Sequence, residues 1–191
     1  MKHRLSRAIL CAALSFFIAS TYPNPASAQN TAALHEVFVP LAQSFTPPPT
    51  PEQQVLALIN QARRDNGCNV DLVMSSKLTA AAYNHSRDMA INNYFSHTGS
   101  DGSTMVTRAQ AAGYSFSWLA ENIAAGYSTP KDAVDGWMNS SGHRANILNC
   151  NLRETGIGYY YEGDDQSNVH LDGGSTGGPY GYYWTQDFGT P

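Results

Sequence analysis

The sequence predicts an α+β domain in which helices pack on an antiparallel sheet. Apolar residues recur at helical spacing between about residues 51 and 148, whereas the last part of the chain contains short aromatic runs separated by a loop rich in Gly, Asp and Ser. Helices first and strands mostly last are typical of this class. With 42% apolar residues and 11 Lys+Arg against 15 Asp+Glu, the chain is neither disordered nor basic enough for nucleic acid.

Most of the predicted helices begin or end at a recognisable residue. The run Thr50-Pro51-Glu52-Gln53 is a capping box with proline at the first helical position, and Asn66-Gly67 ends that helix. Thr129-Pro130 repeats the same kind of start. The predicted helices therefore cover residues 51–65, 76–92, 104–112 and a segment from 130, with a short helical turn over 142–148.

Two aromatic segments predict the sheet. Residues 155–161 and 180–188 are rich in Tyr, Trp and Phe and short enough to be strands. We expect them to pair in antiparallel fashion, because one loop joins them. The helices would then cover this sheet.

The N-terminus predicts export. Three basic residues precede an apolar run over 8–19, and Ala26-Ser27-Ala28 supplies the small residues of a cleavage site, so residues 1–28 read as a secretory signal peptide. A membrane anchor is the alternative, but the run is broken by polar residues and prolines before it reaches about 20 residues. Residues 29–51 are then a leader with a proline-rich linker, and 52–189 form the domain. No other stretch is apolar enough to span a bilayer, and the mature protein is expected to be secreted.

Signal cleavage also changes the cysteine count. It removes Cys11 and leaves Cys68 and Cys150 in an oxidising compartment. Two cysteines without a C-x-x-C motif favour one disulfide over a zinc or redox site. Two buried free thiols are the alternative.

Three residues are candidates for a functional site. His97 and His143 stand at the ends of predicted elements, where clefts form, and Glu121 lies among apolar residues, where a carboxylate is costly to bury without a partner. Two imidazoles and a carboxylate suit zinc or another divalent ion with an open position. The spacing alone does not show that they converge. His85 falls on an apolar helical face and is expected to be a hydrogen-bonded core residue.

Several ordered blocks resemble the bacterial secreted branch of the CAP superfamily, which comprises the cysteine-rich secretory proteins, antigen 5 and the plant pathogenesis-related proteins. The resemblance rests on the blocks at residues 94–97, 101–102, 120–124, 136–148 and 183–189. It implies an α-β-α sandwich with a cleft that holds two histidines and one or two acids, which bind a divalent ion in some members.

On this resemblance His97, Glu121 and His143 match three of the four cleft positions. The fourth, a second glutamate in many eukaryotic members, falls near Ser140, so this chain departs from the full set. Cys68 and Cys150 resemble the single disulfide of some bacterial members.

Three functions follow as hypotheses. The first is a non-enzymatic extracellular binding domain for a lipid, a cell-wall component or a protein, since no nucleophile–base pair is evident. The second is a metal-dependent hydrolase in which the cleft ion lowers the pKa of a bound water. The third is a structural protein of the envelope, with the cleft residues as a buried polar network. We expect binding rather than catalysis.

Overall fold

The computed structural model describes residues 47–191, so the predicted signal peptide and most of the leader lie outside the described residues. The elements in this range, in chain order, are α1 (Pro51–Asp65), β1 (Val73–Met74), α2 (Ser76–Ile91), β2 (Tyr94–Phe95), α3 (Met105–Ala111), β3 (Trp118–Ala125), α4 (Pro130–Asn139), α5 (Ser141–Ile147), β4 (Glu154–Tyr161), β5 (Val169–Leu171), β6 (Thr176–Gly177) and β7 (Tyr182–Thr190). No helix in this part of the chain is both long and apolar enough to span a membrane.

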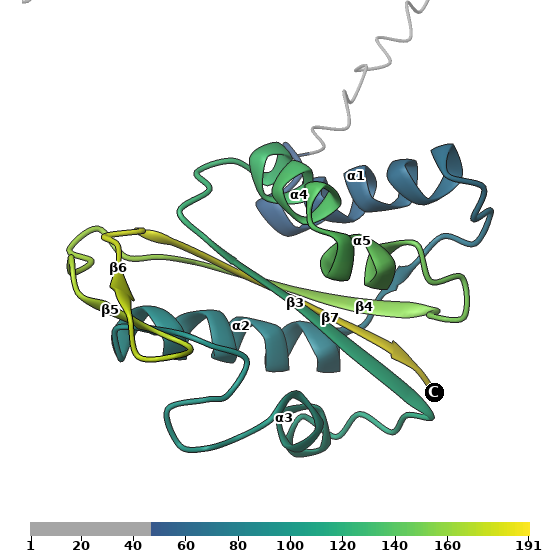
Figure 1. Cartoon of the computed structure of the whole chain (residues 1–191). Coiled ribbons are helices and arrows are strands. Elements are labelled where there is room, and N and C mark those ends of the chain that lie inside the picture. The colour runs from purple at the N-terminus through teal and green to yellow at the C-terminus, as the bar shows by residue number, and fades with distance from the viewer. Residues whose placement is uncertain (1–46) are drawn as a thin grey trace, which may run out of the picture. The chain divides into compact units, whose positions relative to one another are not determined.

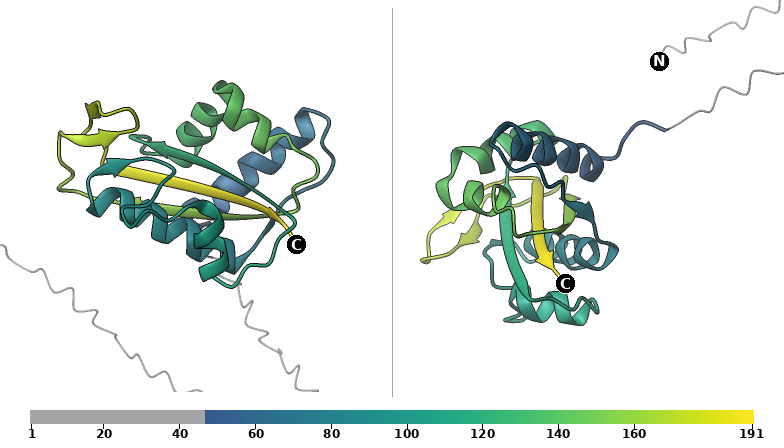
Figure 2. Two further views of the ribbon diagram at one scale, coloured as in Figure 1. Left: turned by 60° about the horizontal axis from the view of Figure 1, so that its bottom comes forward. Right: turned by 90° about the vertical axis from the view of Figure 1, so that its right-hand side faces the viewer.

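The main sheet has the strand order β1-β4-β7-β3. Strands β4 and β3 both pair with β7 in antiparallel fashion, which confirms the predicted pairing of the two aromatic segments. Helices α1, α4 and α5 cover one face of this sheet, and α2 and α3 lie on the other (Figures 1 and 2). The predicted α+β sandwich is therefore confirmed.

The largest apolar core lies between the sheet and the layer of α1, α4 and α5. It contains side chains from all three helices, from β3, β4 and β7 and from the segments that precede β1 and β4, namely Val55, Ile59, Leu72, Ala124, Ala133, Val134, Trp137, Ile147, Leu152, Ile157, Trp184 and Phe188. Burial of this apolar surface is the main favourable contribution to the fold. The core fixes α4 and α5 against the edge of the sheet formed by β3.

On the other face, α2 packs directly on the backbone of β4. A Cβ atom at Gly156 would lie 2.0 Å from the backbone carbon of Leu78, and one at Gly158 would lie 2.2 Å from that of Ala82. Only glycine permits this approach. Helix α2 is therefore held close to β4, the strand next to β7. It lies on the face of the sheet that also carries the Glu121 side chain.

The helix caps and the disulfide predicted from the sequence are present in the structure. Thr50 forms the capping box with Gln53, and Thr129 caps α4 through the backbone N–H of Asp132. Cys68 and Cys150 form a disulfide with their Cα atoms 5.7 Å apart, as predicted. This bond ties the chain after α1 to the chain after α5.

Two parts of the fold were not predicted. Strand β3 at the edge of the main sheet falls on residues for which no element was expected, and β2, β5 and β6 form a small second sheet. Strand β1 is also parallel to β4, so the sheet is not wholly antiparallel. The predicted turn over 142–148 is helix α5.

Candidate functional site

Strand β3 places Glu121 at the centre of the site. Glu121 and Asp187 lie directly opposite each other on β3 and β7. Side chains of a strand alternate between its faces, so Glu121 shares its face with Ile123, which packs against Met89 of α2. The carboxylate therefore lies on the α2 and α3 side of the sheet.

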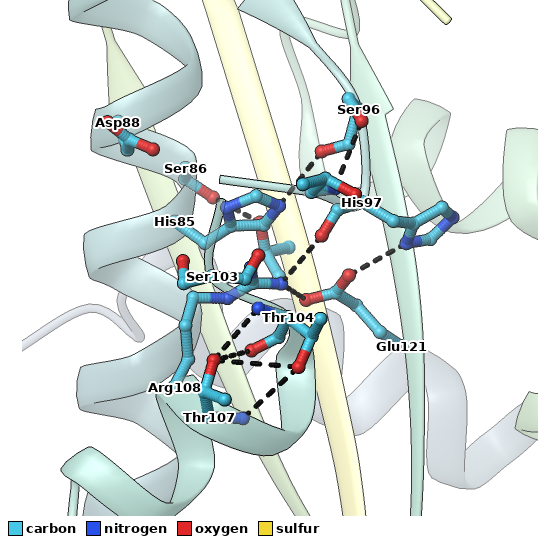
Figure 3. A network of polar contacts seen from close by, with 12 residues as sticks. His85, Ser86, Asp88, Ser96, His97, Ser103, Thr104, Thr107, Arg108 and Glu121 are labelled. Carbon is cyan, nitrogen blue, oxygen red and sulfur yellow. Dashed lines mark hydrogen bonds and ion pairs between the residues drawn. The ribbon is translucent and has the colours of Figure 1, made fainter. Parts of the chain in front are cut away.

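His97 and Arg108 bind the two oxygens of Glu121. The Nδ1 atom of His97 lies 2.7 Å from Oε1, and Nη2 of Arg108 lies 2.6 Å from Oε2 (Figure 3). The Glu121 side chain is only 2% exposed, whereas that of His97 is 52% exposed. Burial alone would raise the pKa of Glu121, but the hydrogen bond from His97 and the charge of Arg108 outweigh it and hold this pKa below its usual value.

Asp187 is a buried acid beside this ionised glutamate. No described N–H or O–H group donates a hydrogen bond to either of its carboxyl oxygens. Burial and the charge of Glu121 raise the pKa of Asp187 well above its usual value. Asp187 is therefore the protonated acid of the pair.

His143 and Ser140 lie where α4 ends and α5 begins, a place that we call the α4–α5 corner. Ser140 is the C-cap residue of α4 and the N-cap residue of α5, and His143 lies in the first turn of α5. Burial and the nearby His97 lower the pKa of His143. Asn122 donates to the backbone oxygen of His143 at 3.2 Å and accepts from Asn146 at 2.9 Å, which fixes α5 against β3.

Two cavities open beside these residues. His97 and Glu121 line one of about 450 Å³ together with Thr104, Met105 and Trp118. Ser140 and His143 line another of about 290 Å³, whose other walls are Phe95, Ile123, Ala124, Ala125, Tyr127, Gly136, Trp137 and Tyr180. The predicted residues thus lie in two neighbouring hollows along the β3 edge.

His85 lies in the core, as predicted from its helical face. Its Nε2 atom is 3.0 Å from the backbone oxygen of Ser96, and the residue is almost fully buried. Burial lowers the pKa of His85 to about 4, so the imidazole is neutral near pH 7. Since a carbonyl only accepts, Nε2 carries the proton.

The described residues do not fit a three-ligand zinc site. Within residues 47–191 no group of three or more His, Cys, Asp or Glu side chains is placed to hold a metal ion. Both oxygens of Glu121 are already bound, one by a permanent cation. The Nδ1 atom of His97 is engaged as well, so two imidazole nitrogens are all that the cleft offers.

Sequence reasoning missed Arg108 and Asp187. Arg108 lies within a correctly predicted helix, but nothing in the spacing shows that its guanidinium reaches β3. Asp187 carried a visible signal, because an acid within an aromatic strand is expected to be buried and to need a partner. The cross-strand register that supplies this partner is a property of the fold.

The layered α+β fold is similar to that of proteins with an SCP domain. A family model for the cysteine-rich secretory protein family, CAP, matches residues 56–188. The chain belongs to this family.

Relatives and solved structures agree with this assignment. The protein YkwD of Bacillus subtilis is 34% identical over 147 residues, and the membrane protein YlbC of the same organism is 37% identical over 109 residues. The matches cover 75% and 57% of this chain, but only 57% of YkwD and 31% of YlbC.

An extracellular protein with an SCP domain from Bacillus anthracis is 29% identical, with a TM-score of 0.59. That match covers 76% of this chain and 45% of the other. An outer surface protein of Borrelia burgdorferi has the same fold at 20% identity, with a TM-score of 0.54 over 71% of this chain and 89% of the other.

Proposed function

We propose that this protein is a non-enzymatic extracellular binding domain that holds the apolar part of a small ligand in the aromatic cavity beside His143. The observation that carries the proposal is the composition of this cavity. Its walls are aromatic or aliphatic over most of their area, and its polar side chains lie near the α4–α5 corner. A volume of about 290 Å³ suits one ring or a short alkyl chain, at the lower end of ligand cavities.

The cavity walls are held in place without a ligand. Trp137 donates to the backbone oxygen of Ile123 at 3.0 Å, and Trp184 donates to that of Tyr127 at 2.7 Å. The rings of Phe95 and Tyr180 pack with their centroids 6.3 Å apart. A preformed apolar cavity favours binding, because little conformational entropy is lost when the ligand enters.

The polar side of the site favours a ligand that donates a hydrogen bond. An ionised carboxylate only accepts, so the Nδ1 atom of His97 carries the proton that Glu121 receives. In the neutral imidazole, Nε2 then presents a lone pair, and it points away from the polar network (Figure 3). His143, whose pKa is lowered, also offers an acceptor nitrogen. A lipid with a hydroxyl group matches these acceptors better than an anion does.

The proposed location is outside the cell. The predicted signal peptide supports export, and the similar protein of Bacillus anthracis is described as extracellular. A cell-wall component or a protein is the alternative ligand. The hydrolase and the envelope role stay predictions from the sequence, and the engagement of Glu121 by Arg108 and His97 does not favour the first.

The test is a calorimetric titration of the full chain with 1-octanol and with octyl methyl ether. Both carry the same alkyl chain, but only the alcohol donates a hydrogen bond. We expect the alcohol to bind at least tenfold more tightly than the ether. A soluble muropeptide serves as the third probe.

The matched variants are S140L and S141L. Ser140 lines the cavity, whereas Ser141 is exposed on α5, so the same leucine fills the cavity only at position 140. We expect S140L to weaken 1-octanol binding more than tenfold and S141L to leave it unchanged. Equal effects of the two variants, or no binding of either alkyl probe, would refute the proposal. Binding of the muropeptide alone would assign a cell-wall ligand instead.

A further inference from the structure

Arg108 is held at three points around Glu121. It extends from α3, and its side chain is 9% exposed. Nη1 donates to the backbone oxygen of Ser103 at 3.1 Å, and Nη2 donates to Glu121 at 2.6 Å and to the backbone oxygen of His97 at 3.2 Å. The guanidinium therefore joins α3, the His97 loop and β3 in one network (Figure 3).

The charges of this network are balanced within the chain. An arginine keeps its positive charge at every pH at which proteins are studied, so it neutralises the Glu121 carboxylate permanently. Asp187, the other acid at this point, is held protonated by its burial and by Glu121. One cation and one anion thus remain in the buried centre, without a metal ion.

A divalent ion bound to Glu121 would meet this guanidinium. Zinc binds carboxylate oxygens at about 2.0–2.2 Å, so an ion at either oxygen would lie within a few ångströms of the Arg108 charge. The repulsion is weakly screened, because the Glu121 side chain is 2% exposed and lies in a region of low dielectric. The ion would bind only if Arg108 left its three partners.

We propose that Arg108 is the built-in counter-ion of Glu121 and occupies the electrostatic role that a divalent cation would have at this carboxylate. Glu121 then orients His97 and is not a metal ligand in this chain. The site keeps its geometry without metal. This inference concerns the charges of the centre and does not depend on which ligand enters the aromatic cavity.

The experiment measures zinc affinity by isothermal titration of the full chain, with R108M, R108K and E121Q as variants. R108M keeps an unbranched flexible side chain, shorter than that of arginine, and removes the charge, whereas R108K keeps the charge. We expect R108M to bind zinc at least tenfold more tightly than the wild type and R108K to resemble the wild type. The double variant R108M/E121Q should lose the gain. Circular dichroism and a thermal melt identify variants that fold.

The variant E121Q decides the question even if R108M does not fold. The glutamine oxygen still accepts from Arg108, so this variant should keep its structure while losing the carboxylate charge. We expect the zinc affinity of E121Q to stay within threefold of the wild type. A larger loss would show that Glu121 binds the ion and would overturn the inference. A folded R108M with no gain in zinc affinity would also overturn it.

Discussion

Replacing Asp187 with asparagine tests whether the Asp187 carboxyl group beside Glu121 is protonated in the folded protein. In the folded protein, Asp187 keeps its proton above the pH at which an unfolded aspartate, with a pKa of about 3.9, releases it. The folded state then binds more protons than the unfolded state. The free energy of unfolding therefore falls as the pH rises from that value through the raised folded pKa.

The size of this effect follows from one proton. Each pH unit in this window reduces the stability of the wild type by ~1.4 kcal/mol through Asp187 alone. The D187N side chain cannot ionise and has nearly the same size as aspartic acid. The difference in stability between D187N and the wild type should therefore shift in favour of D187N by ~1.4 kcal/mol per pH unit.

Urea unfolding followed by tryptophan fluorescence, at a series of pH values upward from about pH 5, measures this difference. Glu121 has a lowered pKa and is ionised in both states over most of this range, so it adds almost no slope. His85 titrates in both proteins, and its contribution cancels in the difference. Parallel curves for D187N and the wild type would show that Asp187 is ionised in the fold and would refute the reasoning.

Three further predictions concern stability and are measured by chemical unfolding. E121A should lose about 3–5 kcal/mol, because it leaves a buried guanidinium unpaired, and a loss below about 1 kcal/mol would contradict the buried ion pair. G156A should destabilise the fold by several kcal/mol or prevent folding, because the added Cβ meets the backbone of α2, whereas G142A, with nothing within 4 Å, should change stability by less than about 1 kcal/mol. Replacing both Cys68 and Cys150 with serine should cost about 2–5 kcal/mol, and an unchanged urea midpoint would contradict this.

The helices could be read from the sequence because their signals are local. Proline at the first helical position and a capping residue marked the starts of α1 and α4, and both lie where they were expected. Strands β4 and β7 were visible from their tyrosines and tryptophan. Strand β3 was missed, because it is buried on both faces over residues 121–124 and is rich in alanine, so it shows neither alternation nor strong strand propensity.

The candidate site was only partly predictable for a related reason. His97 and Glu121 were named from the sequence, and the structure joins them at 2.7 Å. Arg108 and Asp187 meet Glu121 through the packing of α3 and through the register of β3 with β7, which no local pattern contains. The contact with Arg108 changes the expected chemistry of the cleft, because its guanidinium pairs with the carboxylate that was expected to bind a metal ion.

Native mass spectrometry of the secreted full chain, purified and then dialysed exhaustively against EDTA, tests most directly whether the cavity binds its ligand without a metal ion. We predict that the wild type and S141L retain a small bound molecule after chelation, and that S140L does not. Loss of this molecule from the wild type on chelation, with recovery when zinc is restored, would contradict the proposed binding without a metal ion.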